Sequence, residues 1–347
     1  MTSELTVGKV RGLQRCANEF DRFSIMALDA RGILRSAIAP DNPASLPWQR
    51  ISEWKVDITR RVGRHASAVL LDPGYAVAPA IQAGAVARDQ GLLVTLETSG
   101  YENRDDTDHI PPDSRYGEHR INLVAEGWGV EKIKRVGADA VKLLLQYNSA
   151  GTEAADYQME LVDETVRECA RHDIALLLEP ITYSIPGGPA KGSAEFAELK
   201  PGMVIDAARE VCRRGIDVLK AEFPDDTRHV TDRGRLAAHC QELTDAANGV
   251  PWVLLSAGVG YEQFRDQVTI ACENGASGIL VGRAVWQEAI VLEGDHLTEF
   301  IEGSAVPRLQ ELTNIVNEHA VPWTTVVAEK LRAMDTGQGW KLRYEAA

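Results

Sequence analysis

The stretch Gly215-Ile216-Asp217-Val218-Leu219-Lys220-Ala221-Glu222-Phe223-Pro224 places a lysine in the middle of a short apolar run bounded by glycine and proline. Such a run is typical of a buried strand. Because an unpaired ammonium is costly to bury, a lysine in this position usually lowers its pKa. A lysine that is neutral part of the time is a nucleophile toward carbonyl groups. The stretch therefore indicates a reactive Lys220. The structural alternative is an edge-strand lysine that reaches solvent or pairs with Glu222.

Seven further apolar runs alternate with helix-like segments along the chain. The strands expected from them cover residues 23–28, 68–71, 92–97, 140–145, 174–180, 252–258 and 278–283. The helices expected between and around them include 9–20, 48–62, 78–90, 118–136 and 154–172. Near-continuous apolar strands that alternate with helices indicate a parallel sheet covered on its outside.

Eight such units predict an α/β fold, the (β/α)8 TIM barrel, whose usual size of about 250 residues plus insertions suits this chain. We expect one domain over residues 1–347, with the barrel at about 20–304. The segment 9–20 is expected to add an N-terminal helix, and about 305–347 a C-terminal helical extension that packs on the barrel.

Composition narrows the classes of partner. The chain of 347 residues has a net charge of −14, which argues against affinity for nucleic acid or anionic membranes. Five well-separated cysteines are typical of unpaired thiols in a reducing compartment. The first residues lack the apolar core of a signal peptide, and no apolar run approaches about 18 residues. We therefore expect a cytoplasmic protein with a small-molecule partner; homo-oligomerisation stays open.

The chemistry of a barrel enzyme lies at the carboxyl ends of its strands. Two strand lysines, Lys142 and Lys220, are expected there, and if both point inward, burial and mutual repulsion should lower the pKa of one. In the alternative, Lys142 lies near the amino-terminal end of its strand and forms an ion pair with a carboxylate at the bottom of the barrel. The strand-end positions are Asp29, Arg31, Asp72, Glu97, Lys142, Glu179, Lys220, Glu222, Ser256 to Gly258, Gly282 and Arg283.

A phosphate site is expected after the last two strands. Ser256, Gly258 and Gly282 are small residues that expose backbone N–H groups, and Arg283 can bind an oxyanion. The alternative is a tight turn beside a surface arginine.

Several other patterns in the sequence do not indicate a metal or nucleotide site. The eight histidines form no close pair, which argues against a metal site. Gly187-Gly188-Pro189-Ala190-Lys191-Gly192 lacks the frame of a nucleotide phosphate loop, and we interpret it as a mobile loop from which Lys191 could reach a substrate. Gly258-Val259-Gly260 has no third glycine at dinucleotide-binding spacing. The long segments 98–117 and 181–193 are expected to be loops, the first a lid or partly disordered.

Six of these segments, in order, resemble the class I tagatose 1,6-bisphosphate aldolases, whose wider group includes the sulfofructose phosphate aldolases. They are Asp29-Ala30-Arg31-Gly32, Ala138 to Leu144, Leu178-Glu179, Asp217 to Pro224, Leu255 to Val259 and Gly282-Arg283-Ala284. The resemblance runs from about residue 20 to residue 320. It differs at Ala30, where the family usually has glutamine; this leaves the identity of the sugar open.

The resemblance implies roles for these residues. Lys220 would form the Schiff base, Glu179 would shuttle protons, and Lys142 would tune or position. Asp29 would lie by the substrate hydroxyls, with Arg31 near the substrate, and the phosphate would be held by Ser256, Gly258, Gly282 and Arg283. It also implies a metal-independent aldolase without a cofactor that cleaves a phosphorylated ketose to dihydroxyacetone phosphate and an aldehyde. Two alternatives stay open: a sulfofructose phosphate aldolase, and a phosphosugar-binding regulator without turnover.

Overall fold

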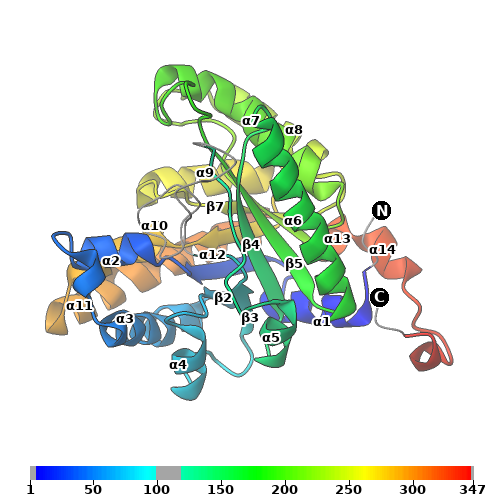
Figure 1. Ribbon diagram of the computed structural model, residues 1–347, viewed down its shortest axis with the longest axis horizontal. Coiled ribbons are helices and arrows are strands. Elements are labelled where there is room, and N and C mark those ends of the chain that lie inside the picture. Colours follow the sequence, from blue (N-terminus) through cyan, green and yellow to red (C-terminus); the bar gives the residue numbers. More distant parts are fainter. Residues whose placement is uncertain (1–4, 99–118, 345–347) are drawn as a thin grey trace.

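Eight apolar runs form eight parallel strands that pair in chain order, and β1 also pairs with β8, so the sheet closes into a barrel (Figure 1). The computed structural model describes residues 5–98 and 119–344. The strands are β1 Phe23–Leu28, β2 Ala68–Leu71, β3 Gly91–Thr95, β4 Ala140–Tyr147, β5 Ala175–Thr182, β6 Val218–Ala221, β7 Trp252–Leu255 and β8 Gly278–Val281.

Helices surround this sheet and extend beyond its last strand. They are α1 Val7–Cys16, α2 Gly32–Ile38, α3 Trp48–Arg61, α4 Val77–Gln82, α5 Val130–Arg135, α6 Thr152–Arg171, α7 Ala194–Cys212, α8 Arg233–Ala247, α9 Tyr261–Glu273, α10 Arg283–Trp286, α11 Gly294–Phe300, α12 Val306–His319, α13 Trp323–Val326 and α14 Ala328–Ala333. The predicted fold class is confirmed: a (β/α)8 barrel with an N-terminal helix and C-terminal helices.

Side chains along each strand alternate between the barrel interior and the layer under the helices, because successive residues of a strand point to opposite faces. The interior set is Phe23, Ile25, Ala27, Ala68, Leu70, Leu93, Ala140, Ala175, Leu177, Val218, Val253 and Leu280. The same rows, continued toward the carboxyl ends of the strands, bring polar side chains to the barrel mouth. Asp29, Lys142, Glu179 and Lys220 each follow an interior residue by two positions.

Helix α1 fills the amino-terminal end of the barrel. Leu13 and Cys16 pack against the interior residues. The ring of Trp323, which begins α13, stacks on that of Phe23 with centroids 6.4 Å apart. In Figure 1, α1 and α14 lie on the same side of the molecule. With this end filled, the polar mouth at the other end is where a ligand can enter.

A buried ion pair and a close backbone approach hold α1 in place. Lys9 Nζ lies 3.0 Å from Asp217 Oδ2. The Asp217 carboxylate also accepts a hydrogen bond from the Leu176 backbone N–H at 2.8 Å. Gly12 lets the helix come this close, since a Cβ there would lie 2.3 Å from the Asp139 carbonyl oxygen.

Three predicted helices have different bounds. The helix expected over 9–20 is α1, which ends before an extended Ala17. The helix expected over 78–90 is α4, which ends early because Gly84 adopts a φ of +61°. The helix expected over 118–136 is reduced to α5, since Gly127 has a φ of +66° and Gly129 is extended.

The two expected loops have different outcomes. The segment predicted over 98–117 lies, apart from Thr98, outside the described residues. The segment predicted over 181–193 is shorter, because β5 continues to Thr182, and the loop covers residues 183–193. All five cysteines are buried and unpaired. Within the described ranges, no helix is both long and apolar enough to cross a bilayer.

Candidate active site

The barrel mouth contains a cavity of about 380 Å³ at the carboxyl ends of the strands. Its wall includes most of the residues predicted from the sequence: Asp29, Arg31, Lys142, Glu179, Lys220, Ser256, Gly282 and Arg283. Gly258 lines a neighbouring cavity of about 360 Å³ instead. This mouth is where barrel enzymes place their chemistry, so the cavity is the candidate active site.

Lys220 extends from β6 into this cavity. Its side chain is 6% exposed, and Nζ lies 2.8 Å from Glu179 Oε2. The edge-strand alternative is wrong, because β6 pairs with β5 on one side and with β7 on the other, where Lys220 lies opposite Val253. The alternative partner, Glu222, turns away from Lys220: its Oε2 accepts hydrogen bonds from the backbone N–H and the hydroxyl of Thr182, both at 2.7 Å.

Lys142 lies at the centre of three carboxylates. Its Nζ donates to Glu97 Oε1 at 2.6 Å and to Asp29 Oδ2 at 2.9 Å, and lies 3.0 Å from Glu179 Oε2. Burial disfavours the Lys142 cation, but Asp29, Glu179 and Glu97 outweigh it and raise the pKa of Lys142 well above its usual range. The sequence predicted a lowered pKa for one of the two strand lysines, and Lys142 is not that lysine. Its position in the mouth also excludes the alternative of a tie at the barrel bottom.

One oxygen of Glu179 is shared by the two lysines. Oε2 contacts both ammonium groups, yet it accepts no hydrogen bond from the described residues. The two cations offset the cost of burying this carboxylate oxygen. Glu179 is part of the cavity wall, so its carboxylate lies where a hydroxyl group of a ligand can approach it.

Asp29 is held as an anion. Burial alone would raise the pKa of Asp29, but Lys142, Lys220 and Arg31 lower it well below the usual range of an aspartate. At neutral pH its carboxylate therefore accepts hydrogen bonds and donates none.

The segments after β7 and β8 meet at Arg283. Ala257 and Gly258 both have positive φ, of 47° and 79°, and the turn is closed by a hydrogen bond from the Val259 N–H to the Ser256 carbonyl at 2.9 Å. A Cβ on Gly258 would lie 2.9 Å from Arg283 Nη2, so the glycine is required for the guanidinium to rest on this turn. This contact connects Gly258 with the predicted phosphate residues, although it lines the next cavity.

Arg283 has the surroundings of an anion-binding group. Burial lowers the pKa of Arg283, while Asp29 and Glu179 oppose that shift. No carboxylate of the described residues forms an ion pair with its guanidinium. Arg283 is a half-buried residue of the cavity wall, and its guanidinium can pair with an anion that a ligand supplies.

Arg31 points to the opposite side of the mouth. Its Nη2 donates to the Glu97 carbonyl oxygen after β3 at 3.0 Å, whereas Arg283 lies on the turn after β7. Strands β3 and β7 face each other across the closed barrel of eight. Arg31, like Arg283, has no carboxylate partner among the described residues. The mouth thus carries two guanidinium groups that contact the ends of opposite strands, β3 and β7.

Several wall residues were not predicted as site residues. Glu97 and Glu222 appeared among the strand-end positions, but nothing in the sequence showed which lysine each would meet. Asn122 lies beyond the expected loop, and its Oδ1 accepts a hydrogen bond from the Gln146 N–H at 2.6 Å. The unpredicted wall residues with polar or aromatic side chains include Glu97, Thr98, Asn122, Gln146, Glu222 and Trp286. Lys191, which was expected to be able to reach a substrate from its loop, also lines the cavity.

One strand-end residue does not belong to the site. Asp72 forms a buried ion pair with Lys55 of α3 and accepts a hydrogen bond from the Tyr75 N–H, and it is absent from the cavity wall. In the described part of the chain, no group of three or more His, Cys, Asp or Glu side chains is arranged to hold a metal ion. The three carboxylates in the mouth converge on the Lys142 ammonium instead.

Comparisons with known proteins show the family of the chain. The DeoC/LacD family aldolases match residues 23–288. A tagatose 1,6-diphosphate aldolase 2 of Streptococcus agalactiae serotype III (strain NEM316) is 30% identical over 337 residues, 92% of this chain and 98% of that protein. A tagatose 1,6-diphosphate aldolase of Lactococcus lactis subsp. lactis is 31% identical over 340 residues, 93% of this chain and 99% of that one. The structure of an archaeal fructose-1,6-bisphosphate aldolase, with its catalytic lysine bound to a carbinolamine intermediate, is similar with a TM-score of 0.53. It is 20% identical and covers 88% of this chain and 98% of that chain.

Fold and lysine-centred mouth define a barrel enzyme of the class I aldolase type, a carbon–carbon lyase. The chain belongs to the DeoC/LacD family of aldolases.

Proposed function

We propose that this protein cleaves a ketose 1,6-bisphosphate of the tagatose type to dihydroxyacetone phosphate and an aldehyde, through a Schiff base on Lys220. The observation that carries the proposal is the arrangement of the mouth. Lys220 and Glu179 are in contact, and the same cavity holds Arg31, whose guanidinium lies at the end of β3, and Arg283, on the turn after β7, neither of which pairs with a carboxylate of the described residues. Each guanidinium suits one terminal phosphate.

The positions of the two guanidinium groups support an assignment of one phosphate to each. Arg283 lies on the turn after β7, the strand next to Lys220, so it would hold the phosphate adjacent to the reacting carbonyl. Ser256 and the backbone around Gly258 and Gly282 complete this side. Arg31 lies across the barrel and would hold the phosphate at the far end of the sugar.

The chemistry follows from the residue types. The neutral amine of Lys220 attacks the ketose C2 carbonyl, and loss of water from the carbinolamine gives an iminium. Glu179 Oε2 accepts the proton of the C4 hydroxyl, the C3–C4 bond breaks, and its electron pair passes to the iminium to give an enamine. The aldehyde leaves, C3 of the enamine is reprotonated, and hydrolysis releases dihydroxyacetone phosphate and Lys220.

The remaining charged groups position the substrate. Lys142, held as a cation by three carboxylates, keeps Glu179 and Asp29 in place and stabilises negative charge in the mouth. Asp29 accepts a hydrogen bond from a sugar hydroxyl. Ala30 lines the cavity where the resembling aldolases usually carry glutamine, so no side-chain amide contacts the sugar from this position.

Paired arginine variants test this assignment. A charge-assisted hydrogen bond contributes about 1.5–3 kcal/mol. Arg283→Ala should therefore lower kcat/KM by roughly one to two orders of magnitude for both the bisphosphate and the ketose 1-phosphate. Arg31→Ala should lower it comparably for the bisphosphate and have little effect for the 1-phosphate. Steady-state kinetics with the two substrates distinguishes the two variants.

The same measurement can overturn the assignment. If both arginine variants lose activity equally with both substrates, the guanidinium groups support the Lys220 environment and do not read the phosphates. A panel with tagatose and fructose 1,6-bisphosphates and a sulfonated ketose 1-phosphate identifies the substrate. Binding of these compounds without turnover by the intact protein would favour the regulatory alternative.

Catalysis should not depend on a metal ion. A Schiff base supplies the electron sink that a metal provides in other aldolases. Activity with the best ketose bisphosphate should therefore survive exhaustive treatment with EDTA. Loss of activity on chelation, with recovery on adding a divalent cation, would contradict the proposed mechanism.

A further inference from the structure

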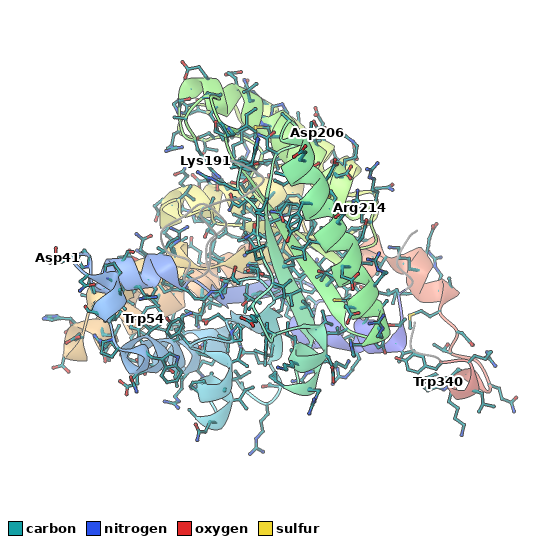
Figure 2. All side chains as sticks on the ribbon, in the orientation of Figure 1. Asp41, Trp54, Lys191, Asp206, Arg214 and Trp340 are labelled. Carbon is teal, nitrogen blue, oxygen red and sulfur yellow. The ribbon has the colours of Figure 1, made fainter. Side chains whose placement is uncertain are left out.

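The loop of residues 183–193, between β5 and α7, is fastened to the barrel mouth by one lysine. Lys191 Nζ donates to the Thr182 carbonyl oxygen at 2.7 Å and to Glu222 Oε1 at 3.2 Å. The loop is also held by His229, whose Nε2 lies 3.1 Å from the Gly192 carbonyl oxygen. Figure 2 shows Lys191 on the segment that leads into α7.

Glu222 is a buried carboxylate with both oxygens engaged. Its side chain is 2% exposed; Oε2 is bonded to Thr182 and Oε1 to Lys191. Glu222 follows Lys220 by two residues on the same inward row, a separation of about 7 Å along a strand. It is thus the carboxylate nearest to Lys220 in the chain, yet its bonds direct it to the neighbouring strand.

Lys191 and Glu222 also separate two cavities. Both residues line the candidate active site and the neighbouring cavity of about 360 Å³. Leu255 and Ala257 complete the shared wall. The contact between Lys191 and Glu222 is therefore part of the boundary of the catalytic cavity.

We propose that Lys191 and Glu222 form a positioning pair for the chemistry at Lys220: Lys191 fixes the loop of residues 183–193 and holds the Glu222 carboxylate against Thr182, away from the reactive amine. The inference rests on the proposed Schiff-base role of Lys220. Neither member of the pair needs to touch the reacting atoms.

The charged groups around Glu222 and Lys220 determine the effect of removing Lys191. Glu222 faces Lys191 from the loop and Lys200 from α7. Lys220 faces Glu179 of β5, and Asp29 at the end of β1 is close enough to interact with it; Lys142 of β4 and Arg283 after β8 line the same cavity. Without Lys191, the buried Glu222 loses one of its two cationic neighbours. Its negative charge then stabilises the Lys220 ammonium and disfavours the neutral amine that attacks the carbonyl.

The test measures the rate of borohydride trapping of a ketose phosphate on Lys220 as a function of pH. Lys191→Met should move the midpoint of this profile upward by about one pH unit, the size expected for one poorly screened charge at this distance. Lys191→Arg should restore the wild-type midpoint. Adding Glu222→Gln to Lys191→Met should also restore it, because the responsible charge is then absent.

A matched control removes a lysine far from the mouth. Lys341 is exposed and adjacent to Trp340, which lies on the opposite side of the molecule from Lys191 in Figure 2. Lys341→Met should leave the profile unchanged. An unchanged midpoint in Lys191→Met, or a shift that persists in the double variant, would overturn the pairing. If variants at buried Glu222 do not fold, comparing the pH profiles of Lys191→Met and Lys191→Arg still tests the pairing, because the Lys191 side chain is half-exposed.

Hydrogen exchange provides a readout independent of turnover. Amides of residues 183–193 should exchange about ten-fold faster in Lys191→Met than in the wild-type protein and in Lys191→Arg, because a fastening contact is lost. Unchanged exchange would overturn the fastening role. A wild-type protein that traps no substrate on Lys220 would instead contradict the proposed function, and the exchange data would still decide the role of Lys191.

Discussion

Lys220→Arg should abolish aldol cleavage, with kcat falling by roughly four orders of magnitude or more. Arginine keeps a positive charge beside Glu179 and a comparable side-chain length, but a guanidinium is always protonated and cannot form a Schiff base. The variant therefore isolates the nucleophile from the charge. Stopped assays of aldehyde release, together with a melting temperature close to that of the wild type, check the result.

Covalent trapping identifies the lysine directly. Borohydride added with substrate should fix one adduct, and peptide mass spectrometry should place it on Lys220. Lys142 is the internal comparison, because it lies in the same cavity and contacts the same Glu179 oxygen. Its three carboxylate neighbours keep it protonated, so an adduct on Lys142 would contradict this reading of the mouth.

The barrel itself could be predicted because it depends on a local pattern. Eight short apolar runs, each followed by a helix-like segment, have few solutions other than a closed parallel sheet. The alternation of side chains points Asp29, Lys142, Glu179 and Lys220 into the barrel, and their places near the carboxyl ends of parallel strands bring them to one end of it. Helix ends were predicted less well. The spacing of apolar residues does not reveal that Gly84 and Gly127 adopt a positive φ, which interrupts a helix.

The contacts within the site could not be predicted in the same way. The sequence offers several strand-end carboxylates, but whether Glu97 or Glu222 meets a given lysine depends on strand order and side-chain direction. Three carboxylates surround Lys142 and raise its pKa, which the sequence alone did not indicate. The direction of Arg31, toward the end of β3, likewise depends on a backbone carbonyl that no motif marks. These contacts and pKa shifts arise only when the ends of all the strands come together at the barrel mouth.

Glu179→Gln should separate the two halves of the reaction. The amide keeps the size of the side chain but cannot accept the C4 hydroxyl proton, so kcat should fall by about two to four orders of magnitude. Schiff-base formation should persist, because removing the shared carboxylate leaves Lys142 and Lys220 to repel each other and favours the neutral amine of Lys220. Borohydride should therefore still trap a ketose bisphosphate on Lys220 in a variant that hardly cleaves it.

The rival for the role of base is Asp29, a carboxylate of the same cavity that contacts Lys142 and interacts with Lys220. Asp29→Asn provides the matched variant, since it also replaces one carboxylate of the Lys142 cluster by an amide of the same size. We expect Asp29→Asn to weaken substrate binding more than it slows cleavage, because its carboxylate orients a hydroxyl. If Asp29→Asn instead traps substrate without cleaving it while Glu179→Gln still turns over, the proton acceptor is Asp29. The Glu179 oxygen shared by the two lysines then serves only to offset their mutual repulsion.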